Sequence, residues 1–233
     1  MLEYFNDGYD LVQDPSDPSI VYAVGSHTLD NKTRMAFCKS SDWGLTWPVQ
    51  RDIWNEPSGC ISFAVALSNS QYLYAGGKFM SAGIILISTN GGITWVDVTN
   101  NLYEFHSSIW DVKAIFVDPE DFRRVLIGTT GGVFKTTNAG SSWSATPLSY
   151  SVTDLAWEHN TGTIYAATPF LGLFCSTDFA STWQPLNEGL GCLEIECLAF
   201  DPVNRMLYAG TTRGACWRLS LERPQGVNCW MFF

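Results

Sequence analysis

Four Asp or Asn residues occupy the same place in four copies of one eight-residue phrase, which reads Ser-X-Asp-X-Gly-X-Thr-Trp in its commonest form: Asp42, Asn90, Asn138 and Asp178. Repeated carboxylates could act as general acids and bases, but two of the four side chains are amides, which can do neither. Turn chemistry accounts for all of them. An Asp or Asn side chain accepts hydrogen bonds from nearby backbone N–H groups, and Gly supplies a positive φ. We therefore interpret the phrase as a structural turn.

A tryptophan closes each copy, and these residues set the period of the chain. Trp47, Trp95, Trp143 and Trp183 are 48, 48 and 40 residues apart. A constant spacing in this range indicates a repeat architecture. The indole offers a large apolar face for packing between neighbouring units. We therefore expect the four tryptophans to be largely buried.

Other carboxylates lie near the expected starts of the first strand of a unit: Asp10, Asp111, Asp154, Glu194 and Glu196. Glycoside hydrolysis needs two carboxylates facing one another at roughly 5–10 Å. These five could approach a central channel, but the sequence selects no pair among them. No catalytic residue is assigned, and hydrolysis stays an alternative to a role without catalysis.

The cysteines number seven and contain no Cys-X-X-Cys pair: Cys38, Cys60, Cys175, Cys192, Cys197, Cys216 and Cys229. Their spread argues against a structural zinc site, which needs four clustered ligands. Most fall in expected strands, where a free thiol behaves as a small hydrophobe. A disulfide between Cys192 and Cys197 is the less favoured alternative. We expect neither a metal nor a cofactor.

Short apolar runs bounded by Gly, Pro, Asn and Asp precede each phrase, as at residues 114–117, 125–128 and 132–135. A fourth run leaves from the Trp, and no sustained 3.6-residue period indicates a long helix. Four strands per unit, repeated radially, describe a blade of a β-propeller. We predict an all-β, single-domain propeller of about five four-stranded antiparallel blades, with units near residues 1–55, 56–104, 105–149, 150–190 and 191–233.

The last unit lacks the phrase. Residues 227–233 are apolar enough to supply its outer strand, and we expect them to be paired, because an exposed tail of this composition would aggregate. Alternatively, residues 2–5 close the ring by adding to the last blade.

The run Gly-Val-Phe-Lys-Thr-Thr-Asn-Ala-Gly-Ser-Ser-Trp at residues 132–143 resembles the Asp-box, or BNR, family of β-propellers. The resemblance covers nearly the whole chain and is nearest to the xyloglucanase and photosystem II assembly-factor branches. The chain differs from the sialidases of the family, whose first arginine stands in a Phe/Tyr-Arg-Ile/Leu-Pro motif that is absent here. Family members usually carry more than five units, so the chain is a compact ring, a fragment or part of an assembly.

Composition limits the class of partner. The chain of 233 residues has a net charge of −10, which argues against nucleic-acid binding, and no apolar stretch is long enough to span a membrane. The first residues lack the basic and apolar regions of a signal peptide. The default location is therefore cytoplasmic, with an extracytoplasmic one as second choice from the family resemblance.

In a propeller, the inter-blade loops and the loops between second and third strands open on one face, which we call the loop face; the phrases lie on the opposite face. Loops carry function because their side chains do not disturb the scaffold. Aromatic, charged and imidazole groups gather there: Trp54, Glu56, Tyr103, His106, Phe170 and Arg213. For Trp54 and Tyr103, filling gaps between blades is the competing interpretation.

We expect a non-enzymatic scaffold that binds a protein partner through this face. Carbohydrate binding, with or without hydrolysis, is the alternative, and a structural subunit of a homo-oligomer or larger complex is the second alternative.

Overall fold

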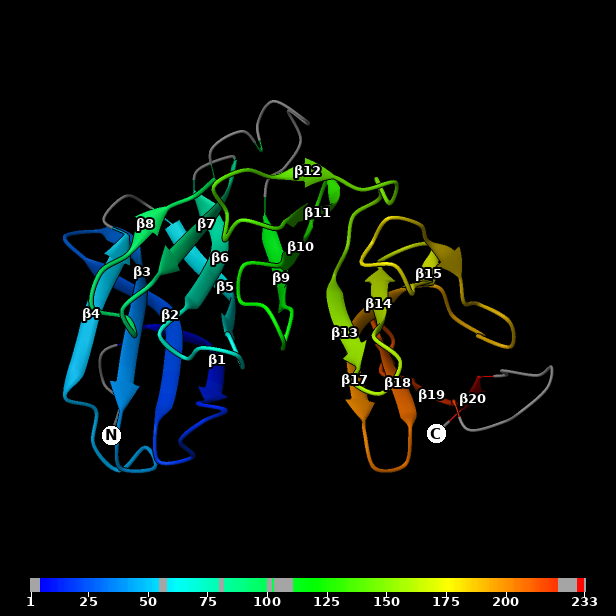
Figure 1. Cartoon of the computed structure of the whole chain (residues 1–233), viewed down its shortest axis with the longest axis horizontal. Coiled ribbons are helices and arrows are strands. Elements are labelled where there is room, and N and C mark those ends of the chain that lie inside the picture. Colours follow the sequence, from blue (N-terminus) through cyan, green and yellow to red (C-terminus); the bar gives the residue numbers. More distant parts are fainter. Residues whose placement is uncertain are drawn as a thin grey trace.

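The computed structural model describes residues 5–54, 58–79, 82–99, 102, 111–221 and 230–232. These residues form five four-stranded antiparallel sheets, which we call blades 1 to 5 (Figure 1). The predicted all-β class and the four-stranded antiparallel blades are confirmed.

Each blade uses four strands that are consecutive in the chain. Blade 1 contains β1 (Asp7–Gln13), β2 (Val21–Leu29), β3 (Lys32–Ser40) and β4 (Val49–Trp54). Blade 2 contains β5 (Ser58–Val65), β6 (Leu73–Phe79), β7 (Ala82–Ser88) and β8 (Val96–Asp97). Blade 3 contains β9 (Val112–Val117), β10 (Val125–Thr129), β11 (Gly132–Thr136) and β12 (Ser144–Ala145).

Blade 4 contains β13 (Asp154–Glu158), β14 (Thr163–Thr168), β15 (Gly172–Ser176) and β16 (Gln184–Pro185). Blade 5 contains β17 (Ile195–Asp201), β18 (Met206–Thr211), β19 (Cys216–Ser220) and β20 (Met231–Phe232). The outer strand of the last unit, expected within residues 227–233, is therefore present as β20, which pairs with β19.

The blades follow one another around an arc, with the first strands β1, β5, β9, β13 and β17 adjacent in chain order (Figure 1). Their faces stack, so the second strands of the inner blades are covered on both sides; all residues of β10 and of β14 are buried. Within the described part of the chain, β1 pairs with β2 alone and β20 with β19 alone, so no sheet closes the arc. The alternative closure by residues 2–5 falls almost entirely outside the described residues.

The repeated phrase folds as a turn between the third and fourth strands, which we call the box turn. In blade 1, Asp42 accepts hydrogen bonds from the Thr46 hydroxyl at 2.5 Å and the Thr46 N–H at 2.8 Å, and Ser40 Oγ accepts one from Gly44 N at 2.9 Å. Asn90, Asn138 and Asp178 repeat the bond to the N–H four residues on. All four copies therefore form the same hydrogen-bonded turn.

Acid–base properties of the box turn follow from these bonds. The Thr46 hydroxyl, then its N–H, lowers the pKa of Asp42 to about 2, because both donors favour the charged carboxylate. The N–H and the hydroxyl of Thr182 lower the pKa of Asp178 to about 2 in the same way. Because their pKa values lie so far below neutral pH, these two carboxyl groups are ionised at neutral pH and cannot act as general acids at that pH.

Burial of the four tryptophans is uneven, which corrects the expectation that all would be largely buried. Trp143 is 3% exposed and donates its indole N–H to Val98 O of the preceding blade at 2.8 Å. Trp47, Trp95 and Trp183 are half-buried. Trp47 lies in blade 1, and its N–H bonds Gly44 O of its own turn at 3.0 Å. Burial thus depends on the neighbouring blade as well as on the phrase.

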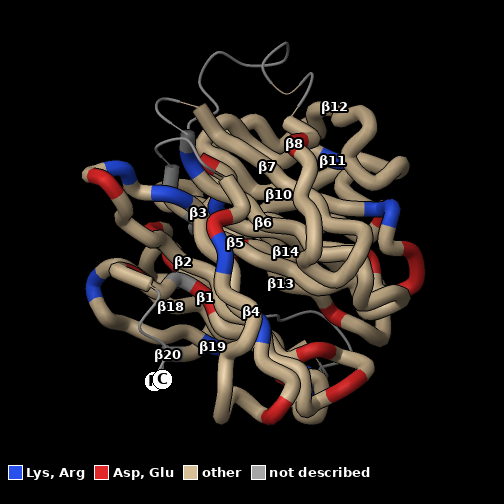
Figure 2. Tube along the Cα trace, turned by 90° about the vertical axis from the view of Figure 1, so that its left-hand side faces the viewer, with Lys and Arg blue, Asp and Glu red and all other residues tan. Residues whose placement is uncertain are grey.

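Cys38, Cys175, Cys192, Cys197 and Cys216 are free thiols, so the alternative disulfide between Cys192 and Cys197 is absent. The described residues contain no cluster of His, Cys, Asp and Glu that could hold a metal ion and no helix able to span a membrane. In the view of Figure 2, acidic and basic positions are interspersed around the periphery.

Candidate docking surface

The loop between β14 and β15 presents Phe170 to solvent. Thr168 Oγ1 donates to Gly172 O at 2.8 Å and accepts from Leu171 N at 2.9 Å, which ties the two ends of the loop together. Pro169 and Phe170 lie between these ties. The Phe170 side chain is 75% exposed. A closed turn therefore holds an aromatic ring in water.

The corresponding loop of blade 3 shows that the turn does not need this ring. There, Thr129 Oγ1 donates to Gly132 O at 2.8 Å and accepts from Gly131 N at 3.0 Å. The equivalent threonine hydroxyl closes a loop that is one residue shorter and carries Thr130-Gly131 in place of Pro169-Phe170-Leu171. The extra residue and the ring in blade 4 are thus additions to a turn that is already complete without them.

Apolar side chains from other loops of this face lie beside residues 168–172: Tyr150 beside Phe170, and Leu193 beside Gly172. Tyr150, from the loop between blades 3 and 4, is 53% exposed and stacks on Phe174 with ring centroids 6.5 Å apart. Tyr150 and residues 168–171 line a shallow hollow of about 310 Å³. Leu171 and Leu193 are also exposed. We call Tyr150, Phe170, Leu171 and Leu193 the apolar cluster.

Gly172 and Asn187 fix this cluster in place. Asn187 accepts from Leu173 N at 2.8 Å and donates to Leu171 O at 2.9 Å, so one amide side chain bonds the backbone on both sides of Gly172. Gly172 has φ +77°, and a Cβ there would lie 2.2 Å from Asn187 Oδ1 and 2.9 Å from Leu193 Cδ2. Only glycine allows this close approach. The cluster is consequently held by its own scaffold.

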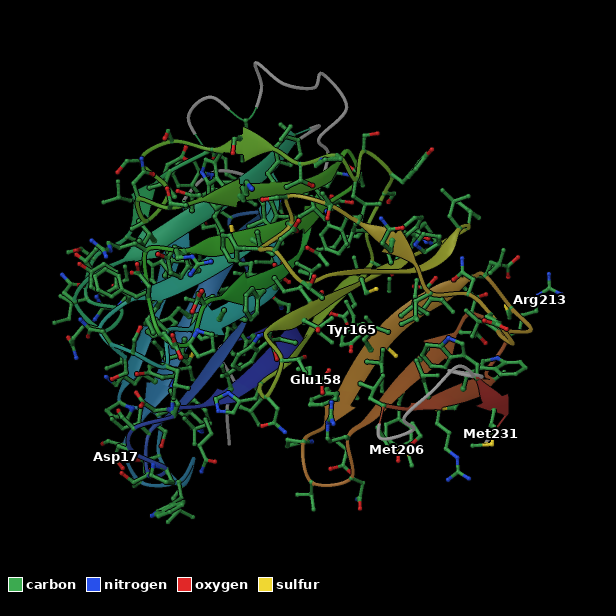
Figure 3. The ribbon with its side chains drawn as sticks, turned by 45° about the vertical axis from the view of Figure 1, so that its right-hand side comes forward. Asp17, Glu158, Tyr165, Met206, Arg213 and Met231 are labelled. Carbon is green, nitrogen blue, oxygen red and sulfur yellow. The ribbon has the colours of Figure 1, made fainter. Side chains whose placement is uncertain are left out.

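A charged pair borders the cluster on blade 5. Glu194, which follows Leu193, accepts from Thr212 Oγ1 at 2.9 Å and from Arg213 Nε at 3.3 Å. The Thr212 hydroxyl, followed by the Arg213 guanidinium, lowers the pKa of Glu194. Arg213 is 79% exposed on its side chain and projects outward at the edge of the molecule (Figure 3). The predicted residues Phe170 and Arg213 therefore both lie on the loop face.

The other predicted site residues are placed differently. Trp54 is half-buried at the end of β4 and packs against the core shared by blades 1 and 2, as the gap-filling interpretation expects. Glu56, Tyr103 and His106 lie outside the described residues and stay predictions. Sequence reasoning missed Tyr150 and Leu193; the signal that could have found them is an apolar side chain in an inter-blade loop.

Two of the five candidate carboxylates come together near the centre of the arc. Asp10 and Asp154 both have a raised pKa, mainly through burial, and the charge of Asp10 adds to the shift at Asp154. Both oxygens of Asp154 are occupied: Oδ1 accepts from Leu155 N at 2.8 Å, and Oδ2 accepts from Leu198 N on the next blade at 2.7 Å. Asp10 likewise accepts from Leu11 and from Phe63 on the next blade.

These bonds connect first strands of neighbouring blades. Glu194 is half-buried and paired with Arg213, Glu196 is exposed, and Asp111 is half-buried. The bonds of Asp10 and Asp154 therefore favour a role in joining blades over one in acid–base chemistry.

Comparisons with known proteins agree with this architecture. No protein-family model matches the chain, and no curated protein matches it. Among solved structures, the fold is similar to the GH74 enzyme of Niastella koreensis, with a TM-score of 0.76 and 19% identity over 98% of this chain and 38% of that chain.

A YCF48 protein bound to a D1 peptide gives a TM-score of 0.66 and 16% identity over 100% of this chain and 68% of that one. Sqt1 from Chaetomium thermophilum gives a TM-score of 0.63 and 13% identity over 95% of this chain and 70% of that one. At such identities, the likeness shows the fold alone, which is that of β-propeller proteins. The chain spans less than two fifths of the length of the GH74 enzyme.

Proposed function

We propose that this chain is a protein-binding β-propeller of the Asp-box type whose loop face docks a partner, with Phe170 as the central anchor. The observation that carries the proposal is the exposed ring on a loop that closes without it. Interface cores are enriched in aromatic residues, and a few such anchors supply most of the binding free energy. The hollow beside Phe170 gives a partner side chain a place to enter.

Two further observations support a protein as the ligand. The apolar cluster joins leucines to aromatic rings and is bordered by the Glu194–Arg213 pair, so an apolar centre has a charged rim, as in protein interfaces. One structural neighbour, YCF48, is bound to a peptide.

Glycan binding is the second candidate, because Tyr150 and Phe170 present exposed rings and the neighbours include a GH74 glycoside hydrolase. We place it second because leucines accompany the rings in the apolar cluster, and we propose no hydrolysis because the central carboxylates Asp10 and Asp154 are engaged by backbone amides.

The test begins by identifying the partner with a photocrosslinking amino acid at position 170 and, as control, at position 45. Leu45 is an apolar residue that is 78% exposed on the box turn of blade 1, at the opposite face. With the partner purified, Phe170→Ala should weaken binding about tenfold or more, as loss of an anchor does, and Leu45→Ala should leave affinity unchanged. Because both side chains are exposed, neither variant should shift the melting temperature.

Equal affinity for wild type and Phe170→Ala, with a loss in Leu45→Ala, would refute this placement. Release of the partner by a xyloglucan oligosaccharide that itself binds the wild type but not Phe170→Ala would transfer the site to the glycan candidate.

A further inference from the structure

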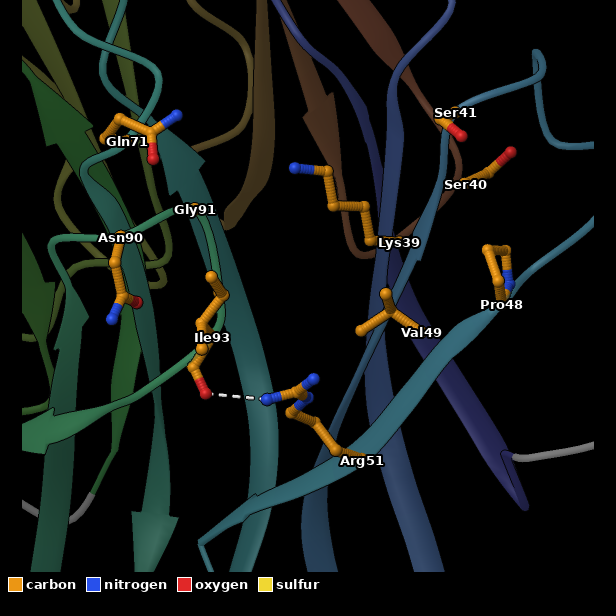
Figure 4. Close-up of a pocket in the computed structure, with 11 residues that line it drawn as sticks. Lys39, Ser40, Ser41, Pro48, Val49, Arg51, Gln71, Asn90, Gly91 and Ile93 are labelled. Atoms are coloured by element: carbon orange, nitrogen blue, oxygen red, sulfur yellow. Dashed lines mark hydrogen bonds between the residues drawn. The ribbon is translucent and has the colours of Figure 1, made fainter.

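A second site lies between blades 1 and 2 on the face of the box turns, opposite the apolar cluster. It is a pocket of about 280 Å³ (Figure 4). The lining comes from the third strand, box turn and fourth strand of blade 1 and from the β5–β6 loop and box turn of blade 2: Lys39, Ser40, Ser41, Pro48, Val49, Arg51, Gln71, Asn90, Gly91, Gly92 and Ile93. Two of these side chains are cationic, and none is acidic.

Lys39 extends into the pocket, and within the described part of the chain no carboxylate pairs with its ammonium group. Its Nζ lies 3.6 Å from the position that a Cβ on Gly91 would take, and the Gln71 amide oxygen lies 3.2 Å from the same point. The ammonium also sits over the Tyr22 ring, 5.4 Å from its centroid. Among the described residues, it makes no hydrogen bond or ion pair.

Arg51 approaches from the adjacent strand. One terminal nitrogen donates to Ile93 O at 2.6 Å, drawn as the dashed line in Figure 4. Its Nε is buried and has no hydrogen-bond partner in the described part of the chain. A carbonyl neutralises no charge, so Lys39 and Arg51 together leave two positive charges beside one cavity.

The repeat supplies an internal control for Lys39. Lys135 occupies the same place in blade 3, immediately before the first residue of the box. Its Nζ donates to Ser181 Oγ at 3.0 Å and to Phe179 O at 3.4 Å, both in the box turn of blade 4. The counterpart of Ser181 in blade 2 is Ile93, whose side chain cannot accept a hydrogen bond. The lysine that the neighbouring turn satisfies in blade 3 therefore remains available in blade 1.

Arg51 also departs from the repeat. Its counterparts in blades 2 and 3 are Val98 and Thr146, each of which bonds the tryptophan of the following blade: Trp143 Nε1 donates to Val98 O at 2.8 Å, and Trp183 Nε1 donates to Thr146 Oγ1 at 3.3 Å. At Arg51 this bond is missing, and the buried Trp95 Nε1 has no partner among the described residues. An arginine thus replaces an inter-blade packing residue where the pocket opens.

We propose that this pocket binds an oxyanion, a carboxylate or phosphate group, held between Lys39 Nζ and the Arg51 guanidinium. Hydrogen bonds from cationic donors to such groups are short and strong, and arginine and lysine are the usual donors. The pocket collects positive charge in a chain whose net charge is −10, so the attraction is local rather than a property of the whole surface. Gly91 leaves the floor open, because a side chain there would meet both Gln71 and Lys39.

The experiment is an amide-resolved NMR titration of the isotope-labelled chain with inorganic phosphate, sulfate and acetate, and with glucose as a neutral probe. Phosphate should give saturable shifts at Gly91, Gly92 and Ile93, whereas glucose should give none. Lys39→Met should weaken phosphate binding about tenfold or more, the loss expected for one charge-assisted hydrogen bond. Lys135→Met, which removes a lysine already satisfied by its neighbour, should leave phosphate binding unchanged.

A second variant guards against a failure of Lys39→Met to fold. Ile93→Asp places a carboxylate in the pocket at an exposed position, where the chain should still fold. The new carboxylate should pair with the Lys39 ammonium group and so abolish phosphate binding. Shifts that do not saturate, or that spread equally to the Lys135 region, mean an adventitious ion only and overturn the proposal. Equal loss in Lys39→Met and Lys135→Met overturns it too. Phe170→Ala should not change phosphate binding, so the loop-face proposal and this one fail independently.

Discussion

Arg205→Met should destabilise the junction between blades 4 and 5. Arg205, in the turn before β18, donates from Nε at 3.0 Å and from a terminal nitrogen at 2.5 Å to one oxygen of Glu158 at the end of β13. Tyr165 donates its hydroxyl to the other oxygen at 3.0 Å. Glu158 and Tyr165 lie close together in Figure 3. Removing the guanidinium leaves a buried carboxylate with the tyrosine as its remaining donor from this trio.

The size of the effect follows from exposure. The Glu158 side chain is 3% exposed, and breaking a fully buried ion pair costs about 3–5 kcal/mol. Arg205 is 30% exposed, so water reaches the vacated space and part of that cost is recovered. We therefore expect Arg205→Met to lower the free energy of unfolding by about 2–3 kcal/mol. For a domain of this size, that is a fall of roughly 5–10 °C in melting temperature.

A double-mutant cycle in chemical denaturation tests this reasoning. Adding Glu158→Gln removes the uncompensated charge, so the double variant should be less destabilised than the sum of the two single variants by about 1 kcal/mol or more. Arg123→Met is the control, because Arg123 bonds Asp121 through two nitrogens at the surface and should lose no measurable stability. An Arg205→Met chain as stable as wild type, or strictly additive substitutions, would refute the buried-pair argument.

Three further predictions concern the box turns. The folded pKa values of Asp42 and Asp178 lie near 2, below the usual value near 4. The stability that these carboxylates contribute is therefore present above pH 4 and lost as pH falls through 2. Between pH 5 and 2.5, the melting temperature should fall more for wild type than for the Asp42→Asn/Asp178→Asn variant. Trp43→Gly should raise stability by about 0.5–1 kcal/mol in denaturant titration, because Trp43 is exposed and has φ +63°; a loss would contradict this. Gly140→Ala should lower it by about 2 kcal/mol or more, since φ is +82° and the new Cβ would lie 2.8 Å from Val98 Cγ2; an unchanged denaturation midpoint would contradict it.

The box turns were predictable from sequence because their chemistry is local. The Asp42 side chain bonds Ser40 and Thr46, which both belong to the phrase. One conformational detail is not readable from the phrase. Ala180 stands where the other copies have Gly and still has φ +59°, since the surrounding bonds impose the turn on it. Trp143 is buried and Trp183 is half-buried, although both occupy the same place in the phrase and both donate to the preceding blade.

The candidate sites were predictable only in part. Phe170 could be singled out as an aromatic residue in a loop between second and third strands. Tyr150, beside Phe170, and Leu193, beside Gly172, come from the loops before and after blade 4 and could not. The local sequence does not show that Lys135 has a hydrogen-bond partner and Lys39 has none among the described residues. The difference depends on the next blade, where Ser181 follows Lys135 by 46 positions and Ile93 follows Lys39 by 54. Exposure and pairing of this kind require the blades to be stacked.

The indole bonds described for Trp143 and Trp183 all point backwards along the chain, and Trp230 extends the series by donating to Leu186 O at 2.9 Å. Blades 3, 4 and 5 are thus each hydrogen-bonded to the preceding blade, as repeats in a linear array contact their nearest neighbours. Tension applied at the C-terminal end should therefore release blade 5 first and then the earlier blades in turn. Each step should lengthen the chain by about 130–170 Å, the extended span of some forty to fifty residues. Under a pulling force, such a molecule would unfold blade by blade and not in one cooperative step.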